Sequence, residues 1–228
     1  MGKCLFVTGT GTDVGKTYVT ALIVKKLVKS GKKAGYYKAA ISGAEVDAAG
    51  KLVPGDAVYV KNIAGLDSPN ENLVSYVYPE AVSPHLAARL NDNPIDFARI
   101  ERDFSRARES YDYLTMEGSG GIICPLRWDG DEHWGLDDMV KRLGLSVVMV
   151  ADAGLGTINA AVLTEHYLRS QNIPLKGIIL NHYHENNVME QDNLKMIEAM
   201  TKVPVIATVS DGDTELNIDA DDLAKLYE

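Results

Sequence analysis

The sequence is poor in the features that mark disulfide-bonded and membrane proteins. Its 228 residues include only two cysteines, Cys4 and Cys124, and Cys4 stands inside an apolar run, so a disulfide framework is not expected. No apolar run approaches the roughly 18 residues that cross a bilayer. The N-terminus does not resemble a signal peptide. The composition therefore predicts a reduced, cytoplasmic protein without a membrane partner.

Basic residues are also in the minority. The chain has 23 Lys and Arg against 32 Asp and Glu, which gives a formal net charge of -9. A protein that binds the backbone of a nucleic acid needs a broad basic face, so no nucleic-acid partner is expected. An anionic nucleotide is not excluded, because a few local cations and backbone amides are sufficient to bind it.

Groups typical of covalent catalysis and of transition-metal binding are missing as well. No Ser/His/Asp or Cys/His combination is recognisable, so a covalent intermediate is not predicted. The five histidines have no metal-ligand spacing with cysteines or acids. His182 and His184 are interpreted as part of a solvated turn.

A glycine-rich segment near the N-terminus carries the clearest functional pattern. Residues 3–7 form an apolar run, residues 8–17 read Thr-Gly-Thr-Gly-Thr-Asp-Val-Gly-Lys-Thr, and residues 18–28 carry apolar side chains at helical spacing. A strand, a glycine-rich turn and a helix opening with Gly-Lys-Thr are the context of a P-loop, whose inward-pointing backbone N–H groups bind phosphate. Lys16 is then expected on the β- and γ-phosphates, and the Thr17 hydroxyl on Mg²⁺.

The spacing of this loop is unusual. Five residues separate Gly9 from Gly15, whereas the common pattern has four. A glycine-rich turn between a strand and a helix, without any ligand, is the alternative interpretation. The triplet Gly-Lys-Thr in this context favours phosphate binding.

Strand and helix patterns alternate along the whole chain. They predict one α/β domain over residues 1–228, with a P-loop NTPase-like, doubly wound and mostly parallel sheet, helices on both faces, and ligands at the carboxyl ends of the strands. Residues 43–56 are expected to form a long functional loop. The predicted strands are 3–7, 34–40, 73–77, 111–116, 146–151, 176–181 and 203–207, and the later helices are 56–64, 84–90, 95–109, 157–170, 189–200 and 220–226.

Three charged residues near strand ends suit phosphoryl chemistry. Asp56 and Glu117 are the expected further Mg²⁺ contacts, because Mg²⁺ prefers carboxylate, hydroxyl and phosphate oxygens. Taken alone, Asp56 is more typical of a helix N-cap, whereas Glu117 follows a buried strand, where such folds place acids that hold Mg²⁺. Lys38 ends the second predicted strand. A solvated lysine is the alternative there, but the P-loop alongside favours a cation aimed at the transferred phosphoryl group.

Five segments together resemble the dethiobiotin synthetase family, whose loop has the same five-residue spacing. In family order, and over most of the chain, they are residues 8–17, 36–43, 83–88, 117–121 and 154–159. The resemblance implies that 7,8-diaminononanoate takes up CO₂ to form a carbamate, which attacks the γ-phosphate of ATP. The second amine then closes the ureido ring of dethiobiotin with release of phosphate. Mg²⁺ is the implied cofactor.

The resemblance also implies roles for individual residues. Lys16 and Lys38 would be catalytic, and Thr17, Asp56 and Glu117 would hold Mg²⁺. The family is homodimeric, so the turn before the helix at 157–170 would bind the substrate carboxylate in the partner's site. The implied nucleotide contacts are Asp13, Val14, Gly15, Lys16, Thr17, Tyr18, Asp56, Glu117, Gly118, Ser119, Gly120 and Asn181. The implied diamine or carbamate contacts are Thr12, Ser42, Leu155, Gly156, Thr157 and Asn159.

The chain departs from the family pattern at three places. Ala39 replaces a proline, Gly11 replaces an aspartate, and residues 208–213 lack the usual proline-containing loop that contacts the base. The first is expected to make the exit of the second predicted strand less rigid, the second to loosen the P-loop, and the third to leave the preference among ATP, CTP and GTP open. Two rival classes fit less well. A corrinoid a,c-diamide synthase would carry a glutaminase domain, for which the chain is too short. A partitioning-type ATPase switch would have a second lysine in its loop, and residues 8–15 contain none.

Overall fold

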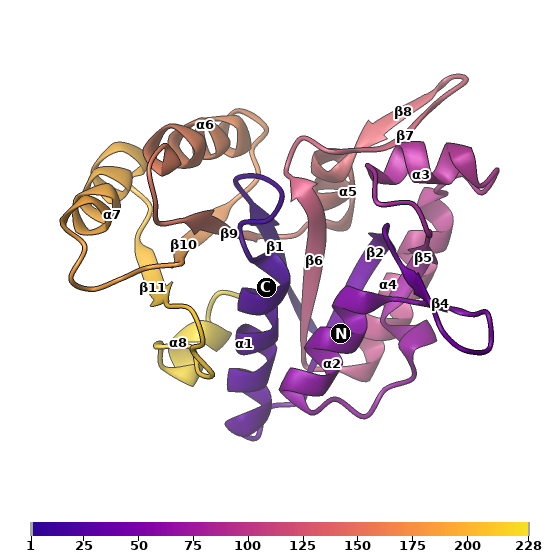
Figure 1. Ribbon diagram of the computed structural model, residues 1–228, viewed down its shortest axis with the longest axis horizontal. Coiled ribbons are helices and arrows are strands. Elements are labelled where there is room, and N and C mark those ends of the chain that lie inside the picture. Colours follow the sequence, from indigo (N-terminus) through magenta and orange to yellow (C-terminus); the bar gives the residue numbers. More distant parts are fainter. Residues whose placement is uncertain (1, 228) are drawn as a thin grey trace.

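The computed structural model describes residues 2–227 and is built on a seven-stranded sheet (Figure 1). The strand order is β11-β10-β9-β1-β6-β2-β5, and each of these pairings is parallel. The predicted mostly parallel α/β sheet is therefore confirmed. Its strands are β1 (Lys3–Gly9), β2 (Ala34–Ile41), β5 (Val74–Val77), β6 (Tyr113–Gly121), β9 (Val147–Asp152), β10 (Leu175–Asn181) and β11 (Val205–Val209).

Helices cover both faces of this sheet, because successive side chains of a strand point to opposite sides. On β1, Leu5 and Val7 pack in one cluster with α1 and α8, whereas Cys4 and Phe6 pack in another with α4 and α5. Helix α2 packs beside α1, and α6 and α7 cover the outer strands on the opposite face. The helices are α1 (Lys16–Lys29), α2 (Gly55–Ala64), α3 (Pro84–Leu90), α4 (Phe97–Ser110), α5 (Leu136–Leu143), α6 (Thr157–Ser170), α7 (Val188–Thr201), α8 (Ala220–Ala224) and the 3₁₀ turn η1 (Asn70–Asn72).

Strand β1 lies in the middle of the sheet, between β6 and β9. The glycine-rich loop after β1 is consequently placed at the centre of the edge where the parallel strands end (Figure 1). This is the edge at which open α/β sheets bind their ligands. Within the described residues 2–227, none of the helices is both long enough and apolar enough to cross a membrane.

Two segments differ from the sequence prediction. Residues 43–56 contain a short antiparallel hairpin of β3 (Glu45–Val46) and β4 (Leu52–Val53) instead of a loop without strands. No helix or strand was predicted for residues 122–145. They form the antiparallel pair β7 (Pro125–Asp129) and β8 (Glu132–Gly135), followed by α5. Both hairpins are too short to give a clear alternating pattern.

The expected positions of Asp56 and Glu117 relative to their elements were wrong. Helix α2 begins at Gly55 with Pro54 at the N-cap position, so Asp56 lies in the first turn and does not cap the helix. Strand β6 continues to Gly121, so Glu117 lies inside the strand instead of after it. The extension follows from pairing on both sides, since Glu117 is opposite Val7 of β1 and Lys38 of β2.

Candidate functional site

The turn between β1 and α1 has the backbone shape of a phosphate-binding loop. Gly15 is the N-cap residue of α1 and has φ 84°, in the left-handed region that favours glycine. A Cβ at this position would lie 2.0 Å from Nδ2 of Asn181, which donates a hydrogen bond of 3.1 Å to the carbonyl of Val14. The end of β10 therefore holds the loop in place. The N-terminus of α1, with the Lys16 side chain beside it, forms the anion-binding end.

Lys16 is folded over this loop. Its ammonium group donates a hydrogen bond of 2.8 Å to the carbonyl of Gly11, and the residue is only 7% exposed. Burial, together with the nearby charge of Lys38, lowers the pKa of Lys16 below that of an ordinary lysine. An anion bound by the loop would therefore stabilise the positively charged form of Lys16.

An ion cluster with a buried lysine and a buried glutamate lies next to the loop. The Lys38 ammonium is 2.6 Å from Oε1 of Glu117 and 2.6 Å from Oδ2 of Asp56. The Thr17 hydroxyl donates to the same Glu117 Oε1 at 2.7 Å, and the Tyr36 hydroxyl donates to Oε2 at 3.1 Å. Both oxygens of the buried Glu117 carboxylate are therefore hydrogen-bonded. The cluster fixes three side chains that the sequence singled out and joins them to the P-loop.

Charges within the cluster keep Lys38 cationic. Burial by itself lowers the pKa of Lys38, but Glu117 and Asp56 act in the opposite direction, and the net effect is a pKa above the ordinary lysine value. Burial and the same two carboxylates raise the pKa of Tyr36 well above its usual range, so this tyrosine remains a hydrogen-bond donor. Lys38 is consequently held as a cation at the wall of the cavity, which suits a group that stabilises a phosphoryl transfer.

One cavity of about 870 Å³ connects the loop with the ion cluster. Its wall also includes His182, Cys124 and residues 81–84, the last of which begins α3. Most of the residues implied by the family resemblance are brought together here: Thr12, Asp13, Gly15, Lys16, Thr17, Tyr18, Lys38, Ser42, Asp56, Glu117, Ser119 and Gly120.

Some implied residues do not line this cavity. Val14 and Asn181 lie behind it, joined by their own hydrogen bond. A Cβ on Gly118 would lie 2.7 Å from the Phe6 ring, so packing between β1 and β6 is sufficient to explain this glycine. Its contact with a nucleotide stays a prediction.

The N-terminal end of α6 also lies outside the cavity wall. Leu155 and Gly156 are in the turn before this helix, and Thr157 and Asn159 are in its first turn. Gly156 is left-handed at φ 93°, and Leu155 is 92% exposed. The Thr157 hydroxyl is buried and, among residues 2–227, has no hydrogen-bond partner. A buried, unpaired hydroxyl at a helix N-terminus suits an anionic ligand.

The sequence interpretation missed Tyr36 and His182. A signal for Tyr36 was present, because residues two apart in a strand lie on the same face and Lys38 was already a candidate. His182 was correctly placed in a turn after β10, with a half-exposed side chain, but its position at the cavity is a property of the fold.

The oxygen groups of the ion cluster suit Mg²⁺. Mg²⁺ is usually held by one or two carboxylates together with substrate phosphates, and the Thr17 hydroxyl and the carboxylates of Asp56 and Glu117 are donors of this kind. Within residues 2–227, no group of three or more His, Cys, Asp or Glu side chains is arranged to hold a metal ion. The site therefore fits a metal that is bound jointly with a nucleotide better than one held by protein alone.

Comparison with known proteins gives consistent matches over the whole chain. Residues 3–214 match a family described as an AAA domain. The chain is 47% identical over 229 residues to "ATP-dependent dethiobiotin synthetase BioD" of Clostridium botulinum (strain Loch Maree / Type A3), with 100% of this chain and 99% of that protein covered. It is 46% identical over 228 residues to the protein of the same name from Brachyspira hyodysenteriae, with both chains covered completely.

Solved structures with similar folds are more distant in sequence. The MinC:MinD cell division protein complex of Aquifex aeolicus matches with a TM-score of 0.54 and 17% identity over 92% of this chain and 81% of that one. A ParA family ATPase from Chlorobium tepidum TLS matches with a TM-score of 0.55 and 14% identity over 93% and 86% of the two chains. At this level of identity the likeness concerns the fold alone.

Proposed function

Because the chain belongs to the dethiobiotin synthetase family, we propose that the cavity beside the P-loop is the site of its reaction. The activity is the ATP-dependent closure of the ureido ring in biotin biosynthesis, which makes the protein a ligase. One observation supports this location above all others. The same cavity is lined by five residues that come from four separate elements: Lys16, Thr17, Lys38, Asp56 and Glu117.

The reaction consists of steps in which negative charge develops or moves on oxygen atoms. One amine of 7,8-diaminononanoate adds to CO₂ and loses a proton, which gives a carbamate. A carbamate oxygen attacks the γ-phosphorus of ATP, the bond to the ADP oxygen breaks, and a carbamic-phosphoric anhydride forms. The second amine attacks the carbonyl carbon and loses a proton, and phosphate leaves with the bonding electrons. Catalysis of this kind needs mainly positioning and fixed charges.

The residues of the cavity divide these tasks. The backbone from Asp13 to Tyr18 binds the phosphates, and Lys16 exchanges its contact with the Gly11 carbonyl for the β/γ oxygens. Lys38 neutralises the carbamate and the migrating phosphoryl group, because it is held as a cation at the wall of the cavity. Thr12 and Ser42 line the same space and contact the diamine or its carbamate.

Magnesium completes the charge balance. Thr17, Asp56 and Glu117 would hold the ion, which supplies a charge that neutralises the β- and γ-phosphate oxygens. Glu117 is kept ready for this by hydrogen bonds to both of its oxygens, from Tyr36 on one side and from Thr17 and Lys38 on the other.

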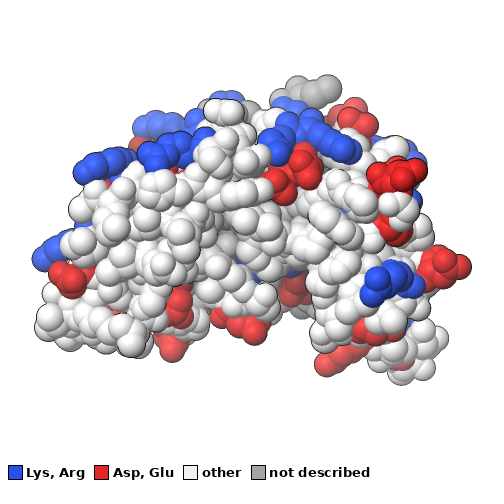
Figure 2. Space-filling model, turned by 90° about the horizontal axis from the view of Figure 1, so that it is seen from above, with Lys and Arg blue, Asp and Glu red and all other residues white. Residues whose placement is uncertain are grey.

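A second protomer completes the substrate site in this proposal. The N-terminal end of α6 lies outside the cavity wall, yet the hydroxyl of Thr157, its first residue, is buried and unpaired among residues 2–227. Exposed apolar side chains stand on and beside α6, including Leu155 at 92% and Leu163 at 60% exposure. Seen from above, the molecule has a broad central area without charged side chains (Figure 2). A homodimer covers these apolar groups and brings the α6 turn of one protomer to the substrate carboxylate in its partner.

The decisive experiment is a product assay with ¹³C-labelled bicarbonate. Incubation with 7,8-diaminononanoate, ATP and Mg²⁺ is expected to yield labelled dethiobiotin, detected by mass spectrometry, and omission of Mg²⁺ or ATP is expected to abolish it. ATP hydrolysis that proceeds at the same rate with and without the diamine, and without labelled product, would instead indicate a regulatory ATPase.

Mixing two inactive variants tests the shared site. Lys38→Ala removes the cation inside one protomer, and Gly156→Asp places a carboxylate where the partner's substrate carboxylate would bind. Asp tolerates the left-handed backbone, and no atom lies within 4 Å of a Cβ at this position. A refolded equal mixture is expected to recover about a quarter of the wild-type activity, because half of the dimers are mixed and each has one intact site. No recovery would show that each site belongs to a single protomer.

A further inference from the structure

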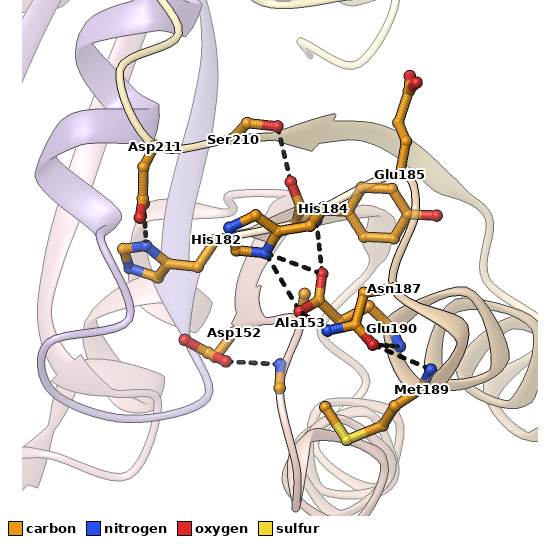
Figure 3. A network of polar contacts seen from close by, with 12 residues as sticks. Asp152, Ala153, His182, His184, Glu185, Asn187, Met189, Glu190, Ser210 and Asp211 are labelled. Carbon is orange, nitrogen blue, oxygen red and sulfur yellow. Dashed lines mark hydrogen bonds and ion pairs between the residues drawn. The ribbon is translucent and has the colours of Figure 1, made fainter.

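The turn before α6, residues 153–156, is held in place by two side chains that lie outside it. Asn193 of α7 donates from Nδ2 to the carbonyl of Ala153 at 2.8 Å and to the carbonyl of Gly154 at 3.1 Å. Asp152, at the end of β9, accepts on Oδ1 from the N–H of Gly154 at 2.6 Å, and Figure 3 shows this carboxylate turned toward the backbone just after Ala153. Three backbone groups of the turn are therefore fixed by side chains of its surroundings.

Asn193 is placed for this contact by the way α7 begins. Asn187 caps α7, and Glu190 in the first turn accepts from the Asn187 amide at 2.7 Å and from the N–H of His184 (Figure 3). Glu190, Asn193 and Ile197 lie on the buried face of the helix, because residues three and four apart share a face. Asn193 itself is only 6% exposed. Its amide consequently reaches the turn from a firmly anchored helix.

The direction of the two carbonyls determines where the next N–H group points. Within a planar trans peptide unit, the C=O and N–H groups point in opposite directions. The carbonyl of Gly154 points to Asn193 on α7, so the N–H of Leu155 points away from α7. Leu155 is 92% exposed, and the space beside it is therefore open. The turn thus keeps its carbonyls on the inner side and presents a donor on the outer side.

The beginning of α6 supplies further donors. The helix has 14 residues, and the first N–H groups of an α-helix have no partner within it. Within residues 2–227, no side chain caps this helix, and the buried hydroxyl of Thr157 has no hydrogen-bond partner. Carbonyl oxygens on the same side would repel an anion, so their attachment to α7 favours anion binding here. The Asp152 carboxylate opposes an anion as well, and its bond to the N–H of Gly154 partly offsets that charge.

We propose that Asn193 is a positioning residue for the substrate carboxylate. It does not touch the substrate. It holds the carbonyls of Ala153 and Gly154 against α7, so that the N–H of Leu155 and the N-terminus of α6 face the carboxylate of the substrate in the partner's cavity. Loss of the amide releases the turn, whereas the P-loop and the ion cluster belong to other elements and keep their geometry. This inference rests on the proposed function, because it requires a diamine that carries a carboxylate.

The test uses two substrates that differ only in the carboxylate. KM and kcat are measured by mass spectrometry of the ring-closed products from 7,8-diaminononanoate and from 7,8-diaminononan-1-ol, in which a hydroxymethyl group replaces the carboxylate. The wild type is expected to have a lower KM for the acid than for the alcohol. In Asn193→Ala the KM for the acid should rise about tenfold, as loss of one hydrogen bond to a charged group does. The KM for the alcohol, the KM for ATP and kcat should stay the same, because binding of the carboxylate is uniform through the reaction.

Two further variants provide controls. Asn187→Ala removes the N-cap of the same helix, so it should lower the melting temperature and leave both KM values at the wild-type level. Asn193→Ser keeps one donor and should give a KM for the acid between those of the wild type and Asn193→Ala. Equal KM values of the wild type for acid and alcohol overturn the inference without any variant, and so does an equal rise of both KM values in a folded Asn193 variant. Absence of ring-closed product from the acid with the wild type contradicts the proposed function itself.

Discussion

The Lys38 ammonium lies 2.6 Å from the Glu117 carboxylate, and both side chains are buried, at 6% and 0% exposure. The two residues face each other across neighbouring strands, since Lys38 and Glu117 are register partners in β2 and β6. Two adjacent strands therefore supply one cation and one anion at the same level of the sheet. Asp56, which lies in α2, forms a second ion pair with Lys38. The arrangement gives the cavity a fixed polarity before any ligand is bound, and the first two predictions follow from it.

Removal of the Lys38 charge is expected to slow turnover. Lys38→Ala should reduce kcat by a factor of about 10² or more, the usual effect of losing one charge-stabilising group. Lys51→Ala is the matched control, because Lys51 pairs with Glu71 at an exposed site. Thermal unfolding must accompany the assay, since a buried carboxylate left without its cation can cost about 3–5 kcal/mol of stability. A folded Lys38→Ala protein with near-normal kcat would remove Lys38 from the mechanism.

Tyr36 and Tyr37 allow a paired comparison, because they point to opposite faces of β2. The Tyr36 hydroxyl binds Glu117, whereas the Tyr37 hydroxyl lies 2.7 Å from Ser75 Oγ. Tyr36→Phe is expected to lower kcat several-fold and to raise the Mg²⁺ concentration needed for half-maximal rate. Tyr37→Phe should lose about 1 kcal/mol of stability without changing the Mg²⁺ dependence. Equal Mg²⁺ titrations for the two variants would show that Tyr36 has only a structural role.

Glycines of the P-loop should differ in their tolerance of a methyl group. In Gly15→Ala the added Cβ would disfavour the left-handed backbone with φ 84° and would collide with the Asn181 amide. We therefore expect a loss of more than about 1 kcal/mol in stability and a large loss of ATP binding. Gly11→Ala meets no atom within 4 Å of the added Cβ and should bind ATP normally. Calorimetric ATP titrations of both variants provide the measurement. Equal affinity in the two variants would contradict the role assigned to the Gly15 backbone.

The buried cysteines predict a loss of stability at alkaline pH. Burial raises the pKa of Cys4 and of Cys124 from 9.0 to about 11. The unfolded chain therefore loses these protons at lower pH than the folded protein, so their contribution is complete below pH 9 and is lost as the pH rises toward 11. Urea unfolding from pH 8 to pH 10.5 measures this effect. In Cys124→Ser the fall should be shallower than in the wild type, and identical slopes would contradict the assignment.

Sequence patterns predicted the sheet well because the relevant information is local. The P-loop strand, the helix after it and the buried strand at β9 are each defined by neighbouring residues. The hairpin of β7 and β8 was missed although Gly130 marks a turn at its tip, with φ 51°. The two-residue Gly130-Asp131 turn between short strands is a recognised hairpin signal, but four or five residues on each side give little periodicity.

The site was harder to predict than the sheet because its contacts join distant residues. Lys38 and Glu117 are 79 positions apart in the sequence, and nothing local indicates that they pair. Asp56 illustrates the consequence, since the local pattern indicated a helix cap whereas the folded chain directs its carboxylate to Lys38. The ring of His182 is placed by Asp211, 29 positions away, for the same reason.

The central position of β1 has a consequence for the order in which the protein can assemble. Its two neighbours, β6 and β9, begin at residues 113 and 147, so a chain emerging from the ribosome exposes its first strand long before either partner has been made. Pairing over such sequence distances folds slowly and leaves apolar segments uncovered in the meantime. Nucleotide cannot assist the early stages, because the loop that would bind it has no rigid support until more than half of the polypeptide has been synthesised.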